Sequence, residues 1–77
     1  MENTGIVYEF DLPFGDIRIE DFVKHIDRNF SNLIENVEAI ENKVVVYFNN
    51  PEKRKNFLFK PRIPLARVTI YYIPKST

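Results

Sequence analysis

The chain has 77 residues, no cysteine, and eleven acidic side chains balanced by eleven basic ones. A chain shorter than about 80 residues supports a single domain, 1–77, with a small core, and the lack of cysteine excludes disulfides, thiolate metal sites and thiol catalysis. No apolar run approaches the roughly 20 residues needed to span a bilayer, so we expect a cytoplasmic chain without a membrane partner.

The charges are segregated along the chain. Residues 1–50 carry ten carboxylates against four cations, whereas residues 51–77 carry one carboxylate against seven cations. The two segments therefore have net charges of −6 and +6 at neutral pH. Opposed fields of this kind steer association and orient partners more than they stabilise a fold. The charge pattern therefore predicts that the protein recognises a partner.

The N-terminal segment alternates in polarity. Over residues 5–12 every second side chain is apolar, which is typical of a half-buried strand. The residues expected to face the core are Ile6, Tyr8, Phe10 and Leu12. Proline and glycine in the following segment, 13–16, predict a turn.

A helix is predicted from about Ile19, where the apolar period becomes helical. If Arg18 occupies the N-cap position, Ile17 can pack on the first turns as a hydrophobic staple. The apolar face of this helix is formed by Phe22, Val23, Ile26, Phe30 and Leu33.

Residues 37–48 predict a β-hairpin with Glu41-Asn42 as a two-residue turn. Asparagine in this turn tolerates the left-handed backbone that such hairpins require. The register that follows places apolar pairs on one side and mixed pairs on the other. The expected pairs are Val37 with Val46, Ala39 with Val44, Ile40 with Lys43, and Glu38 with Val45.

The dipeptide Asn50-Pro51 is typical of a helix N-cap followed by proline at the first helical position. This second helix must be short, about 51–58, because Pro61 and Pro64 impose extended backbone.

Alternation returns over residues 66–73, which predicts a last strand ended by Pro74. The element order then fits an α+β, ferredoxin-like βαββ(α)β sandwich: a four-stranded antiparallel sheet with one main helix and a reduced second helix. With the strand order 4-1-3-2, one face of the sheet is expected to be buried. Its members are Tyr8, Phe10, Val37, Ala39, Val44, Val46, Val68 and Ile70.

The opposite, open face of this sheet mixes valine, tyrosine and charged residues. A sheet covered on one side only, with aromatic side chains on the other, is suited to contact with a partner. The predicted partner interface comprises Tyr47, Tyr71, Val45 and Val7. The partner is another protein or a second copy in a homo-oligomer.

The segment 53–67 interleaves cations with aromatic side chains, as phosphate contact combined with base stacking would require. The cations can equally remain solvated around a closed core, or contact an acidic protein surface. Nucleic-acid binding is therefore the alternative function. Its candidate residues are Lys53, Arg54, Lys55, Phe57, Phe59, Lys60, Arg62 and Arg67.

No catalytic or metal-binding pattern is present in the sequence. His25 is the only histidine and has no spacing partner for a metal. Two glycines cannot form a phosphate-cradling loop, and the glycine-rich loop of acylphosphatases has no counterpart in residues 13–18. We therefore expect no enzyme, cofactor, metal or small-molecule substrate. The predicted function is a small non-enzymatic interaction module, an oligomer-forming or accessory subunit of a larger assembly.

Overall fold

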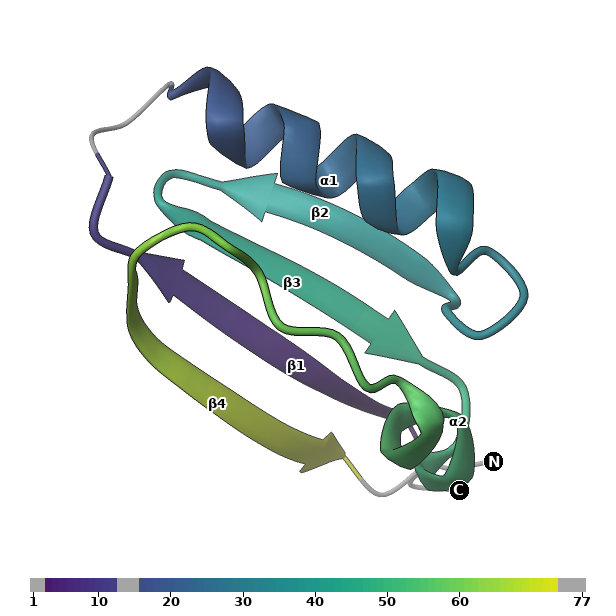
Figure 1. Cartoon of the computed structure of the whole chain (residues 1–77). Coiled ribbons are helices and arrows are strands. Elements are labelled where there is room, and N and C mark those ends of the chain that lie inside the picture. Colours follow the sequence, from purple (N-terminus) through teal and green to yellow (C-terminus); the bar gives the residue numbers. More distant parts are fainter. Residues whose placement is uncertain (1–2, 13–15, 74–77) are drawn as a thin grey trace.

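The computed structural model describes residues 3–12 and 16–73 (Figure 1). Most of the turn predicted at 13–16 lies outside these ranges, as does Pro74. The elements in chain order are β1 (Asn3–Phe10), α1 (Ile17–Asn29), β2 (Asn36–Ile40), β3 (Lys43–Phe48), α2 (Pro51–Asn56) and β4 (Leu65–Ile73).

The four strands form one antiparallel sheet in the order β2-β3-β1-β4. This is the predicted order, and the α+β βαββ(α)β fold class is confirmed. Helix α1 lies along β2 on one face of the sheet, and α2 lies at the end of β1 and β3 (Figure 1). The connector between α2 and β4, residues 57–64, crosses above β1 on the same face as α1.

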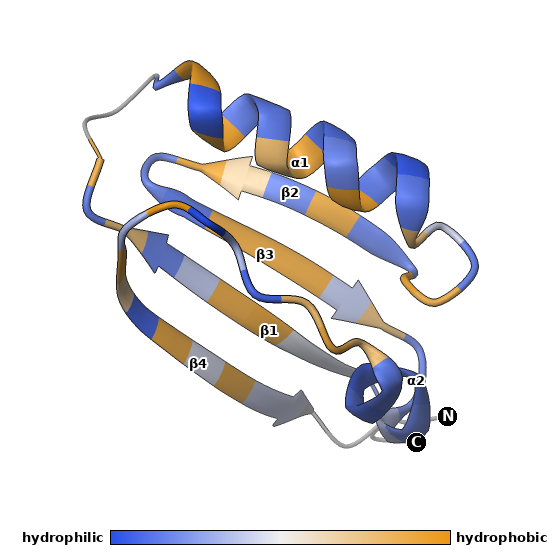
Figure 2. Ribbon diagram, viewed as in Figure 1, coloured by the Kyte–Doolittle hydropathy of each residue, from blue (hydrophilic) through white to orange (hydrophobic). Residues whose placement is uncertain are grey.

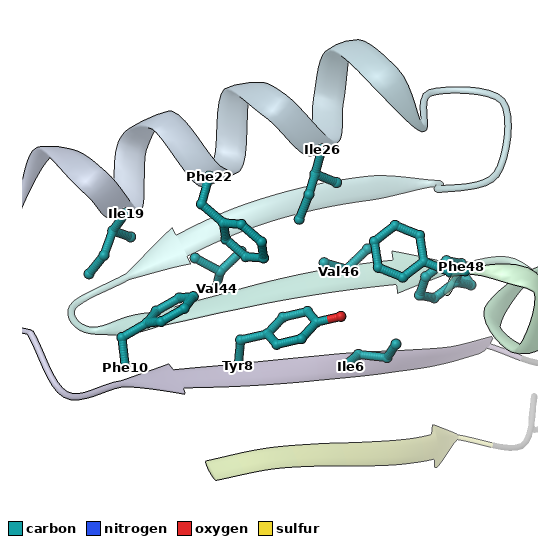
Figure 3. Packing of buried hydrophobic residues seen from close by; sticks show 10 residues of the cluster. Ile6, Tyr8, Phe10, Ile19, Phe22, Ile26, Val44, Val46 and Phe48 are labelled. Atoms are coloured by element: carbon teal, nitrogen blue, oxygen red, sulfur yellow. The ribbon is translucent and has the colours of Figure 1, made fainter. Parts of the chain in front are cut away.

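The core lies between α1, the connector and the three strands β1, β2 and β3. Phe22 occupies its centre, with its ring edge-on to the rings of Tyr8 and Phe10 at centroid distances of 5.3 Å (Figure 3). Such edge-to-face pairs stabilise a small core beyond the area that they bury. The buried apolar residues are Ile6, Tyr8, Phe10, Ile19, Phe22, Ile26, Val44, Val46, Phe48 and Phe57.

The β2–β3 hairpin has the predicted two-residue turn and the predicted register. The residue with left-handed backbone is Glu41, with a φ of 56°, and not the asparagine that the sequence favoured. Asn42 instead joins the turn to β1. Its side-chain Nδ2 donates to the carbonyl of Phe10 at 2.9 Å, and its own carbonyl accepts from the Phe10 N–H at 2.8 Å. The turn is therefore fixed by tertiary hydrogen bonds.

The prediction of Arg18 as the N-cap of α1 was wrong. The helix begins at Ile17, and its N-cap is Asp16, whose Oδ1 accepts from the Arg18 backbone N–H at 2.8 Å. A carboxylate can accept a hydrogen bond from the orphan N–H groups of the first turn, whereas a guanidinium cannot. The Arg18 guanidinium binds the same carboxylate through Nε at 3.0 Å and Nη2 at 2.8 Å. Ile17 is exposed and forms no staple.

The Asp16 cap predicts a pH dependence of stability. Hydrogen bonds from the Arg18 side chain and backbone lower the pKa of Asp16 to about 2. The stabilisation is complete above the unfolded-state pKa of about 4 and is lost as the pH falls towards about 2. At neutral pH we expect the melting temperature to fall slightly in Asp16→Asn, which keeps a capping oxygen, and further in Asp16→Ala. Thermal melts from neutral pH to pH 2 check this, and equal stability of the alanine variant and the wild type at neutral pH would contradict it.

Helix α2 ends at Asn56, two residues before the predicted limit, and Asn50 caps it as expected. The Asn50 Oδ1 accepts from the Lys53 backbone N–H at 2.8 Å. A helix this short cannot extend over β4, and Figure 2 shows no helix above the hydrophobic positions of that strand. The prediction that Val68 and Ile70 are buried was therefore wrong. Both lie on the expected face of the sheet, but about half of each residue is exposed. Ala39 on the edge strand β2, predicted to be buried as well, is also exposed.

Candidate functional site

An apolar groove of about 700 Å³ lies between the connector and β4. It is open because α2 is too short to cover the sheet there. The residues that line this apolar groove are Ile6, Tyr8, Phe57, Leu58, Phe59, Lys60, Pro61, Leu65, Val68 and Ile70.

The groove exposes large aliphatic side chains at neighbouring positions. Leu58 is 89% exposed, Ile70 58% and Val68 48%. Single exposed apolar residues are common on protein surfaces, but a contiguous group lining a groove is typical of a binding site. The groove is therefore the first candidate site, and it was not predicted from the sequence.

Burial alternates along the start of the connector, where Phe57 is buried, Leu58 is exposed and Phe59 is half-buried. Phe57 packs inwards with its ring edge-on to Phe30 and Phe48, at centroid distances of 4.9 and 5.3 Å. Phe59 stacks on Phe22 at 5.4 Å. The two phenylalanines hold the connector against the core, and Leu58 between them is left in solvent.

Tyr8 lies at the floor of the groove. Its hydroxyl donates a long hydrogen bond of 3.4 Å to the carbonyl of Phe59, and burial raises its pKa to about 12. Ionisation of this tyrosine is therefore unfavourable in the folded protein.

Alkaline unfolding tests this environment. Because the unfolded chain ionises at about pH 10 and folded Tyr8 at about pH 12, stability should decline as the pH rises from 10 to 12. Tyr8→Phe should cost little at neutral pH, since the hydrogen bond is long, and should lose less stability than the wild type in the alkaline range. Urea titrations at successive pH values measure both effects. An identical alkaline decline in the two proteins would show that Tyr8 does not contribute.

The groove carries little charge. Among the described residues, its lining contains the cation Lys60 and no carboxylate. Arg67, on the opposite face of β4, has a side chain that is 74% exposed and pairs with Glu9. The groove is therefore an apolar surface with a single cation in its lining.

The predicted partner interface lies together on the opposite face of the sheet. Val7 is directly opposite Val45, and Tyr47 and Tyr71 flank Gly5 from the two neighbouring strands. The tyrosine rings meet edge to face at 6.5 Å. All four predicted residues are half-buried, so this face offers less exposed apolar surface than the groove does.

Because residue 5 is a glycine, the Tyr71 side chain can lie across β1 on the open face of the sheet. The Tyr71 ring lies where a Cβ at position 5 would be, so any larger residue there would displace the ring. On the same face Glu9 forms ion pairs with Lys43 at 3.7 Å and with Arg67 at 3.6 Å. Tyr47 donates to Glu38 at 3.2 Å. Burial, followed by interactions with nearby ionisable groups, raises the pKa of both tyrosines.

The predicted basic segment is divided between core and surface. Phe57 is buried, so it cannot stack on a base without leaving the core, and Phe59 is half-buried. Arg54 is half-buried, and its Nε has no hydrogen-bond partner among the described residues. Within the described residues, only Arg67 of this segment forms an ion pair. The cations without one are Lys53, Arg54, Lys55, Lys60 and Arg62.

A second, shallower cavity of about 540 Å³ lies between α1 and the connector. Its walls bring Arg18 and His25 of α1 to the same site as Lys60 and Arg62 of the connector. His25 also packs on Phe59 at a ring distance of 5.2 Å. The remaining lining residues are Asp21, Phe22 and Ile63.

Within residues 3–12 and 16–73, no three histidine, aspartate or glutamate side chains come together as metal ligands. No helix in these ranges is long and apolar enough to cross a bilayer. Comparison of the chain with protein families, curated proteins and solved structures found no match.

Proposed function

We propose that this protein is a small non-enzymatic interaction module, an accessory subunit that binds another protein chain through the apolar groove. The observation that carries the proposal is the exposure of Leu58, Val68 and Ile70 side by side along one groove. Exposed aliphatic area of this kind is unfavourable in water, and a bound protein segment removes it from solvent.

Two isoleucines provide a matched test. Ile70 lines the groove and is 58% exposed, whereas Ile40 lies on β2, outside the groove, and is 53% exposed. Lysine at either position should be tolerated by the fold, because each side chain already contacts solvent. Only Ile70→Lys places a charge in the proposed binding surface.

The experiment is a display selection of random peptides on the immobilised protein, followed by binding measurements on variants. We expect enriched peptides to bind the wild type and Ile40→Lys, and to lose binding to Ile70→Lys. The variant Tyr47→Ala tests the open face, and loss of binding there with retention in Ile70→Lys would place the interface on that face. Selection without enriched ligands would count against an interaction module.

A second copy of the chain is one partner that this function allows. Light scattering coupled to size exclusion measures the mass at low and high salt. A dimer or larger species that resists salt and becomes monomeric in Ile70→Lys would identify the groove as a surface for self-association.

Nucleic-acid binding is the second candidate function, and the cationic cavity beside Phe59 favours it. Lys60 and Arg62 line that cavity and have no ion-pair partner within the described residues. Binding to a single-stranded oligonucleotide should weaken with salt by a slope of about −0.7 per phosphate contact. Replacing Lys60 and Arg62 by serine should reduce both affinity and slope. Salt-independent binding would contradict this function.

A further inference from the structure

We propose that the occupant of the apolar groove is an extended segment of another protein, alternately acidic and apolar, which pairs with the free edge of β4. This inference rests on the proposed function, because it names the partner of the same groove. It follows from three observations: the position of β4 in the sheet, the two faces of that strand, and the charge around it.

The first observation is that β4 is an edge strand. It spans Leu65–Ile73, and in the described part of the chain β1 is its only neighbouring strand. An edge strand presents backbone donors and acceptors to a further strand. The other edge, β2, is only five residues long and carries Glu38, with Glu35 and Glu41 at its ends. Short length and negative charge protect β2 from pairing with a further strand. In contrast, β4 is nine residues long and has no charged side chain over residues 68–71.

The second observation is the alternation of β4. On one face Val68 and Ile70 lie in the groove, and on the other Arg67 and Thr69 lie on the open face of the sheet. Side chains of an added strand would alternate in the same way. Those on the groove side would cover Val68, Ile70 and Leu58, so they must be apolar. Those on the other side would lie beside Arg67.

The third observation is charge. Lys60 lines the groove, and the Arg67 side chain is 74% exposed although its Nε pairs with Glu9 at 3.6 Å. The chain beyond residue 50 has a net charge of +6. Opposite charge across an interface accelerates association and suppresses wrong partners. Acidic side chains are therefore expected at the alternate positions of the segment, which lie beside Arg67 on the open face of the sheet.

A second copy fits this surface less well. Antiparallel pairing of two β4 strands would join two grooves that each contain Lys60 and, within the described residues, no carboxylate, and each Arg67 would bring only the Glu9 with which it already pairs. Pairing of β4 with the acidic edge β2 of another copy would be heterologous, would form rings or open filaments, and would use an edge of only five residues. The charge therefore favours a different protein as the source of the segment.

The test uses synthetic peptides and the full chain. The probe is a labelled peptide in which glutamate alternates with valine, and its binding is measured by fluorescence anisotropy. One control peptide has lysine in place of each glutamate, and another has the same composition with the alternation broken. A third control carries N-methyl groups on alternate backbone amides, which removes the strand-pairing donors.

We expect the acidic alternating peptide to bind. The affinity of the lysine peptide should be lower by a factor of about ten or more, because the exposed charge pairs become repulsive. Affinity should fall with salt. N-methylation or Ile70→Lys should abolish binding, while Ile40→Lys should not change it. Bound peptide should slow hydrogen exchange of β4 amides and leave β2 amides unchanged.

Failure of this inference is distinguishable from failure of the proposed function. If the displayed peptides bind in an Ile70-dependent way but are not acidic, or leave β4 exchange unchanged, the inference is wrong and the interaction module stands. A salt-resistant oligomer that dissociates in Ile70→Lys would also show that the inference is wrong while the interaction module stands, because the occupant of the groove would then be a second copy. If neither the displayed peptides nor the designed peptide bind, both the proposed function and the inference about the acidic segment are overturned.

Discussion

Replacing Ile26 by alanine is expected to lower the free energy of unfolding by about 2–5 kcal/mol, the usual cost of removing a large aliphatic side chain from a packed core. Ile26 has no exposed surface and projects from α1 onto the sheet (Figure 3). A domain of this length is expected to have a stability of only about 4–12 kcal/mol, so the loss is a large fraction of the total. Urea unfolding followed by circular dichroism measures it.

Ile40→Ala is the matched control, since the same atoms are removed from a side chain that is 53% exposed. Its cost should be less than about 1 kcal/mol. If the two variants lost equal stability, the packing of α1 on the sheet would be incorrect.

Replacing Phe57 by alanine is expected to cost about 3–5 kcal/mol. The ring is 4% exposed and packs against Phe30 and Phe48, so its loss removes the contact that holds the connector on the core. The prediction is therefore global destabilisation, together with faster hydrogen exchange in the segment that follows α2. Urea unfolding and amide exchange measure the two effects.

Its neighbour Leu58 gives the opposite expectation. This side chain is 89% exposed, so Leu58→Ala should leave the stability of the free protein almost unchanged and weaken binding of the groove ligand. Equal destabilisation by the two substitutions would mean that the connector does not alternate as described. Unchanged ligand binding in Leu58→Ala would remove this residue from the binding surface.

Local pattern predicted the elements that depend on local chemistry. The hairpin register follows from a two-residue turn between alternating strands, and Asn50-Pro51 correctly marked the start of α2. The Arg18 cap was wrong because an N-cap needs an acceptor oxygen, which Asp16 has and Arg18 lacks. In the turn, tertiary hydrogen bonds hold Asn42, and the left-handed conformation falls on Glu41 instead.

The groove could not be found from alternation alone. Val68 and Ile70 alternate as buried strand residues do, and their pattern is the same whether or not a helix covers them. The available signal was the prolines at 61 and 64, which shorten α2 and leave the sheet without cover beside β4. The placement of Tyr71 over Gly5 had no signal in the sequence, because it joins residues from the two ends of the chain.

The pairing of β1 with β4 has a consequence for the order of folding. Thr4 donates its hydroxyl proton to the backbone carbonyl of Tyr71, 67 positions away, whereas β2 and β3 are joined by two residues. The hairpin can therefore form early, β1 must close a longer loop to reach β3, and β4 can pair only after β1 is in place. A strand that joins last and has one neighbour is also the one most readily released. Partial opening of the native protein should then begin at β4, and a ligand on that edge would slow the opening.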